Sequence, residues 1–157
     1  MMTQREEQEF LKRIEKAKDK NIFVQKEIGL NSHVRGVYCF YAKREIEEIP
    51  FYIGKSNNIF MRMFTGHIYN YLRGVRNTDV QKRMENYLDN NYSIEVRVLK
   101  RVDYVGDSFI QDANRLALAE LEEIVKQQNK GLCITKDQLS ESIKPSEENA
   151  WNELFKK

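Results

Sequence analysis

Two tyrosines and an arginine are the residues of this chain whose types and spacing suit one reaction. The tyrosines stand in Gly36-Val37-Tyr38 and Tyr52-Ile53-Gly54, and Arg62 lies eight residues after the second tripeptide. A phenol, whose pKa is near 10, accepts a proton at neutral pH only where its phenolate is stabilised. A guanidinium forks onto phosphate oxygens and helps most where negative charge builds up. Together these groups suit a site that binds phosphate oxygens and transfers a proton.

Glu120 stands out because of its place in a helix predicted over residues 108–128. It falls between Leu116 and Ile124 on one row of that helix. Its carboxylate is therefore expected to face the protein interior, where it needs a cation or hydrogen-bond donors. A hard divalent ion held by one carboxylate and waters meets that need. The alternative is a glutamate at the edge of the apolar face that reaches water. The predicted apolar sector is Ala113, Leu116, Ala117, Leu121, Ile124 and Val125.

His67 has two possible places in a helix predicted from residues 56–58 to residue 73. If the helix is regular, His67 packs in an apolar row nearly opposite Arg62. If a bulge or kink occurs at Gly66, His67 turns toward the side of Arg62. The residues alone leave both open. The other members of the apolar row are Phe60, Phe64 and Tyr71.

The hydrophobic pattern predicts an α/β (α+β) chain with a hairpin at its centre. Strands are predicted over 34–42, 51–54 and 92–102, with the polar loop 43–48 joining the first two into an antiparallel hairpin. Helices are predicted over 3–20, 56–73, about 77–88, about 108–128 and from 145 onward. Residues 21–33 are predicted to be a connector, and 132–135 a short strand or a loop.

In their order and spacing, the two tripeptides, the stretch from Tyr52 to Ile59, Arg62 and Glu120 resemble the GIY-YIG nuclease family. Members of that family cut nucleic-acid phosphodiesters. The resemblance covers roughly residues 34–135, leaving 1–33 as an N-terminal helix and connector and 136–157 as a tail with a short helix. It implies a three-stranded, mainly antiparallel sheet flanked by helices.

The resemblance also implies roles for the residues of the two tripeptides and their neighbours. Tyr38 and Tyr52 would flank the attacking water, and Tyr38 is the expected general base. Arg62 would stabilise the transition state, and Glu120 would hold one Mg²⁺ or Mn²⁺ ion. Lys55 and His67 are candidates for tuning the base, although a solvated Lys55 is equally compatible with the sequence. Gly36 and Gly54 would support the site by allowing a close approach of a ligand or another backbone.

This sequence departs from the family pattern at two places. The histidine comes five residues after Arg62, whereas many members have a His or Tyr at four. The asparagine that usually follows the metal-binding glutamate by about a dozen residues is missing, and Cys133 stands near its place. Asn129 comes early and is the candidate for that supporting role. Both departures favour the rival hypothesis, a nucleic-acid-binding or protein-interaction module that keeps the fold without cutting.

Composition limits the remaining possibilities. The length suits one domain, no apolar run is long enough to cross a membrane, and the N-terminus is too charged for a secretory signal. Two distant cysteines predict a reduced, cytoplasmic protein. Residues 55–101 carry nine Lys and Arg against four Asp and Glu, which favours a phosphate-rich partner. DNA is the expected substrate and RNA is not excluded. Specificity is expected to come from loops, a protein partner or a homodimer.

Overall fold

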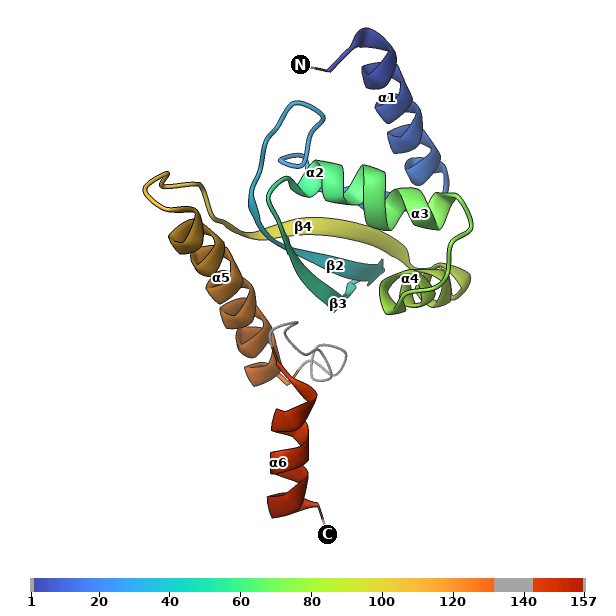
Figure 1. Cartoon of the computed structure of the whole chain (residues 1–157). Helices are drawn as coiled ribbons and strands as arrows, with labels where there is room; N and C mark the ends of the chain where they lie inside the picture. The colour runs from blue at the N-terminus through green and yellow to red at the C-terminus, as the bar shows by residue number, and fades with distance from the viewer. Residues whose placement is uncertain (1, 132–142, 157) are drawn as a thin grey trace.

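The computed structural model describes residues 2–131 and 143–156 of the 157-residue chain (Figure 1). These residues form an α+β fold around a four-stranded mixed sheet that is mostly antiparallel. Its strands are β1 (Ile22–Val24), β2 (Gly36–Arg44), β3 (Glu47–Ser56) and β4 (Ser93–Arg101), in the order β1-β4-β2-β3. The expected three-stranded sheet was one strand short. The connector predicted over 21–33 contains β1, whose three residues become a strand only by pairing in parallel with β4.

The helices begin close to the predicted residues because polar side chains cap them. They are α1 (Gln4–Asp19), α2 (Ile59–Arg62), η1 (Met63–His67), α3 (Ile68–Leu72), α4 (Asp79–Asp89), α5 (Phe109–Asn129) and α6 (Pro145–Phe155). The side chains of Thr3, Asn58 and Ser108 accept hydrogen bonds from the first turns of α1, α2 and α5. The helix predicted over 56–73 is therefore confirmed except for its π-helical middle, η1. The prediction for 132–135 lies outside the described residues.

The hairpin of β2 and β3 is tighter than the predicted six-residue loop. The two strands pair as far as Arg44 and Glu47, which leaves a two-residue turn in which Glu45 has a φ of 55°. The register shifts between Phe40 and Tyr41, opposite Pro50. Because β3 is an edge strand, the missing N–H of Pro50 is tolerated there.

The two faces of the sheet pack against different helices (Figure 1). Tyr38 and Phe40 of β2 share one buried cluster with residues of α1, α2, η1, α3 and α4. Their neighbours Val37 and Cys39 point the other way and pack with residues of α5. Helix α1 contributes Phe10 to the first cluster, so the N-terminal segment is part of the same core as the hairpin. None of the described helices is long and apolar enough to span a membrane.

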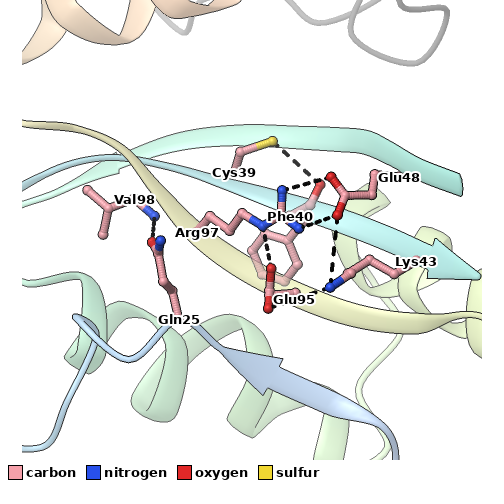
Figure 2. Close-up of polar contacts among 8 residues, drawn as sticks. All are labelled: Gln25, Cys39, Phe40, Lys43, Glu48, Glu95, Arg97 and Val98. Carbon is pink, nitrogen blue, oxygen red and sulfur yellow. Dashed lines mark hydrogen bonds and ion pairs between the residues drawn. The ribbon is translucent and has the colours of Figure 1, made fainter. Parts of the chain in front are cut away.

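A charged cluster occupies part of the second face, beside Cys39 (Figure 2). The Arg97 guanidinium donates to both carboxylate oxygens of Glu48, at 2.7 and 3.0 Å, and also pairs with Glu95. The Lys43 ammonium lies 3.9 Å from a carboxylate oxygen of each glutamate. The cations and carboxylates of this cluster thus neutralise one another, so we interpret it as a structural ion-pair network that links β2, β3 and β4.

Candidate active site

The Tyr38 phenol lies at the centre of the candidate site, in a space that a glycine leaves open. Tyr38 pairs with Gly54 across the hairpin and is only 1% exposed. A Cβ atom on Gly54 would lie 2.4 Å from the Tyr38 hydroxyl oxygen and 2.5 Å from Cζ. The glycine therefore makes room for the ring itself. Gly36 meets another backbone, since a Cβ there would lie 2.1 Å from the Lys100 carbonyl oxygen.

A π-helical segment turns His67 toward this phenol. Residues 63–67 form η1, in which Gly66 has non-helical torsions (φ −121°, ψ −110°) and the N–H of Ile68 bonds to the Met63 carbonyl, five residues back. An i→i+5 bond adds one residue to the turn. His67 thereby comes to the place that the fourth residue after Arg62 would hold in a regular helix. Its Nε2 lies 3.0 Å from the Tyr38 hydroxyl oxygen. The bulge at Gly66, one of the two alternatives drawn from the sequence, is the one observed.

Arg13 of α1 binds a carbonyl that the π-helical segment releases. In a regular helix the Phe64 carbonyl would accept from the N–H of Ile68, which here bonds to Met63 instead. The Arg13 guanidinium donates to the Phe64 carbonyl at 2.7 Å and lies over the Tyr69 ring at 3.7 Å from its centroid. Sequence reasoning missed Arg13 because its partner is 51 residues away and the polar pattern of α1 gives no sign of it. Arg13 thus supports the backbone that orients His67.

Arg62 and Tyr52 complete the surroundings of the phenol. The Arg62 side chain is exposed, and its positive charge acts on the Tyr38 phenol, whose pKa it lowers. The half-buried Tyr52 ring lies 6.4 Å from the Tyr38 ring and 5.5 Å from the His67 ring, centroid to centroid. The side of the site formed by Arg62 and Tyr52 is therefore accessible to solvent, whereas the side formed by Tyr38 and His67 is buried.

Glu120 is buried on α5, as expected, although the apolar sector of that helix was misplaced. Glu120 is 9% exposed and its charge acts on the Tyr38 phenol. The predicted members Leu121 and Val125 are 38% and 44% exposed. The helix is rotated because its close contacts with Val37, Cys39 and Ile53 of the sheet are made by Leu116, Ala119 and Ile124. Asp112 joins this buried stripe because backbone N–H groups of Val105 and Gly106 bind its carboxylate at 2.9 and 3.0 Å.

Burial keeps the two central groups uncharged. Burial is the main cause of the raised pKa of Tyr38. The neighbouring Tyr52 raises this pKa further, whereas Arg62 lowers it. Burial, followed by the charge of Arg62, lowers the pKa of His67 from 6.5 to about 4. At neutral pH the 3.0 Å hydrogen bond therefore joins a neutral phenol and a neutral imidazole. The cation near Tyr38 that we expected is present, but it does not overcome the cost of burying a phenolate.

Two of the predicted site residues, Lys55 and Asn129, do not lie around the Tyr38 phenol. Lys55 pairs with Val37, so its side chain is on the α5 side of the sheet, opposite Tyr38. It lines a hollow with Arg35 and Asn57. Asn129 is the last residue of α5 and is exposed beside Val125. Their roles stay predictions. The structure thus brings Tyr38, His67 and Tyr52 together, and Arg62 and Glu120 act on Tyr38 through their charges.

The donor set of this site suits a loosely held hard cation. Among the described residues there is no group of three or more His, Cys, Asp or Glu side chains placed to hold a metal ion. One carboxylate, that of Glu120, fits Mg²⁺ or Mn²⁺, since Mg²⁺ commonly keeps several waters and takes further oxygens from substrate phosphates. Comparisons of the chain with protein-family models, curated proteins and solved structures found no match. What the site does is therefore inferred from its own geometry.

Proposed function

We propose that this chain is a divalent-metal-dependent endonuclease of the GIY-YIG type that hydrolyses DNA phosphodiester bonds. One observation carries the proposal: the Tyr38 hydroxyl oxygen lies 3.0 Å from His67 Nε2, with Arg62 and Tyr52 on the open side of the same phenol. The proposal joins to these residues Glu120 of α5, whose charge acts on the same phenol. A proton acceptor, a fixed cation and a buried carboxylate are the parts that phosphodiester hydrolysis needs.

In this proposal Tyr38 acts as a proton relay. As water attacks the phosphorus atom, its proton passes to the Tyr38 oxygen while the phenol proton passes to His67 Nε2. No free phenolate forms, which agrees with the raised pKa of Tyr38. The substrate phosphate brings negative charge close to His67, which favours the imidazolium at that moment. Tyr52, half-buried beside both rings, orients the water.

Arg62 and Glu120 have the electrostatic roles. Arg62 is exposed and its charge acts on the Tyr38 phenol, so its N–H groups can bind the phosphate oxygens on which charge builds. Glu120 would hold Mg²⁺ or Mn²⁺, which supplies charge neutralisation at the departing oxygen when bound. Because a single carboxylate binds such an ion weakly, we expect activity to require millimolar metal.

Plasmid nicking tests the proposal directly. Wild-type protein should convert supercoiled plasmid to nicked or linear DNA with Mg²⁺ or Mn²⁺ and lose this activity in EDTA. Glu120→Gln should lower the rate by about two orders of magnitude or more, since metal stabilisation is worth several kcal/mol. Glu122→Gln is the matched control, because Glu122 is exposed on the same helix and pairs only loosely with Lys100, at 3.8 Å. Cleavage that survives EDTA, or Glu120→Gln protein that cuts normally, would refute this mechanism.

The second candidate is a DNA-binding or protein-interaction module that does not cut. The 1% exposure of Tyr38 favours it, because a catalytic phenol must meet water or substrate. The same assay separates the two. A DNA-binding module would bind DNA without nicking it, and neither Glu120→Gln nor Tyr38→Phe would change its binding. A protein-interaction module would neither bind nor nick DNA.

A further inference from the structure

A hollow of about 460 Å³ lies on the α5 side of the sheet, the side from which Glu120 comes. Its walls are the end of β3, the segment between β4 and α5, and the first two turns of α5. Lys55 and Asn57 form one wall, and Leu116, one turn before Glu120, forms another. A strand held over Glu120 would therefore place a neighbouring nucleotide at this hollow. The volume suits a ligand of that size.

Two exposed aromatic rings line the hollow. Phe109 is 85% exposed and Tyr104 is 61% exposed, so both rings are accessible to a ligand in the hollow. The Arg35 guanidinium lies over the Tyr104 ring, 4.1 Å from its centroid. Arg35 is itself 3% exposed and is fixed by bonds to the Val102 and Asp112 carbonyls, each 2.8 Å long. Tyr104 is thus held in place while much of its surface remains open to a ligand.

The charges that face the hollow suit an anionic ligand. Lys55 and Arg35 supply two cations there. The nearby Asp112 carboxylate is taken up by the N–H groups of Val105 and Gly106 and by Arg115, at 2.9 to 3.0 Å. A phosphate next to Lys55 would therefore meet net positive charge. Aromatic surface beside cations is the combination by which proteins bind unpaired nucleotides.

We propose that this hollow binds an unpaired nucleotide of the strand to be cut, with its base stacked on Phe109 and Tyr104 and its phosphate at Lys55. This inference rests on the proposed nuclease function and narrows its substrate to DNA with a single-stranded portion. Paired bases inside a duplex are covered by their neighbours and cannot stack on a protein ring. A blunt duplex should consequently use the basic surface but leave the hollow empty.

The test is a binding titration in EDTA, which prevents cleavage, with two fluorescent oligonucleotides. One is a blunt duplex and the other is the same duplex with a single-stranded extension. Phe109→Ala should weaken binding of the extended DNA about 5- to 100-fold and change binding of the blunt duplex little. Ile110→Ala is the matched control, since Ile110 is 68% exposed next to Phe109 but does not line the hollow. Tyr104→Phe should bind like wild type, whereas Tyr104→Ala should not.

The other outcomes distinguish failure of this inference from failure of the nuclease proposal. If Phe109→Ala leaves both affinities unchanged, or lowers both equally, no unpaired nucleotide occupies the hollow. If that result accompanies normal metal-dependent nicking by wild-type protein, the nuclease proposal survives alone. If Phe109→Ala selectively weakens the extended DNA but the wild type never nicks, the hollow binds nucleotides and the nuclease proposal fails. Wild-type protein that binds neither oligonucleotide refutes both.

Discussion

Replacing Gly54 with alanine tests the candidate site through geometry rather than through its chemical groups. The new Cβ would lie 2.4 Å from the Tyr38 hydroxyl oxygen, whereas ordinary contact begins at 3.4 Å. The ring must retreat by the difference, 1.0 Å. A shift of that size would disrupt the bond from Tyr38 to His67 Nε2, which is now 3.0 Å long.

The expected losses follow from this displacement. Forcing one extra methyl group into a packed core costs about 1–3 kcal/mol, and the lost hydrogen bond about 1 kcal/mol more. For a chain of this size, 2–4 kcal/mol lowers Tm by roughly 5–15 °C. Misplacing a catalytic group by about 1 Å costs up to about 10²-fold in rate. Gly54→Ala protein that is still folded should therefore nick plasmid about 100-fold more slowly.

A thermal melt and a nicking assay on one preparation measure both effects. Gly29→Ala is the control, since its Cβ would meet only the Ser32 hydroxyl, at 3.2 Å, on a side chain that can rotate. Gly54→Ala protein with wild-type Tm and wild-type nicking would show that the close packing of Tyr38 against Gly54 has no bearing on the site. A lowered Tm with unchanged nicking would remove Tyr38 from the mechanism.

Three further predictions concern charge and backbone support. Stability should fall as pH drops from 6.5 toward 4, because the unfolded chain then protonates His67 and the folded chain does not. The free energy of unfolding should fall by about 1.4 kcal/mol per pH unit. In urea melts, the stability of His67→Gln should therefore depend less on pH than that of wild type, and His33→Gln should not show this difference. Glu120→Gln should bind DNA like wild type in EDTA, with an affinity that falls as salt rises, since binding rests on basic side chains. Arg13→Met should lower the free energy of unfolding by about 1–3 kcal/mol, and it should lower kcat more than it changes KM. Arg5→Met, at an exposed position on the same helix, should change neither the stability nor the kinetic constants.

The sequence predicted the elements of the fold better than their pairing. Caps and amphipathic periods are local, which is why α1, α4 and α5 begin and end within a few residues of expectation. Strand β1 could not be predicted because its three residues carry almost no local pattern and depend on β4. The rotation of α5 was likewise set by what it touches: Leu116, Ala119 and Ile124 pack against Val37, Cys39 and Ile53 of the sheet. Asp112 is buried because the N–H groups of Val105 and Gly106, in the segment before α5, bind its carboxylate.

The site shows the same division between local and distant causes. The inward direction of Glu120 followed from its row on α5, and Gly66 marked the place where the helix could change its winding. Which alternative His67 takes depended on two segments outside that helix. Tyr38 offers it a hydrogen bond, and Arg13 binds the Phe64 carbonyl that the change of winding releases. Neither partner can be assigned from the local sequence.

The η1 segment also bears on how catalytic patterns are compared between chains. Patterns are usually written as a fixed number of residues between two functional side chains, but an active site depends on the angle between them about the helix axis. Here five residues, wound with an i→i+5 bond, bring His67 to the direction that four would give in a regular helix. A chain that misses a helical spacing by one residue, with a glycine inside the interval, can therefore present the same constellation. Where one helical turn can accommodate an extra residue, two chains can place a side chain in the same direction with different numbers of residues between the functional positions.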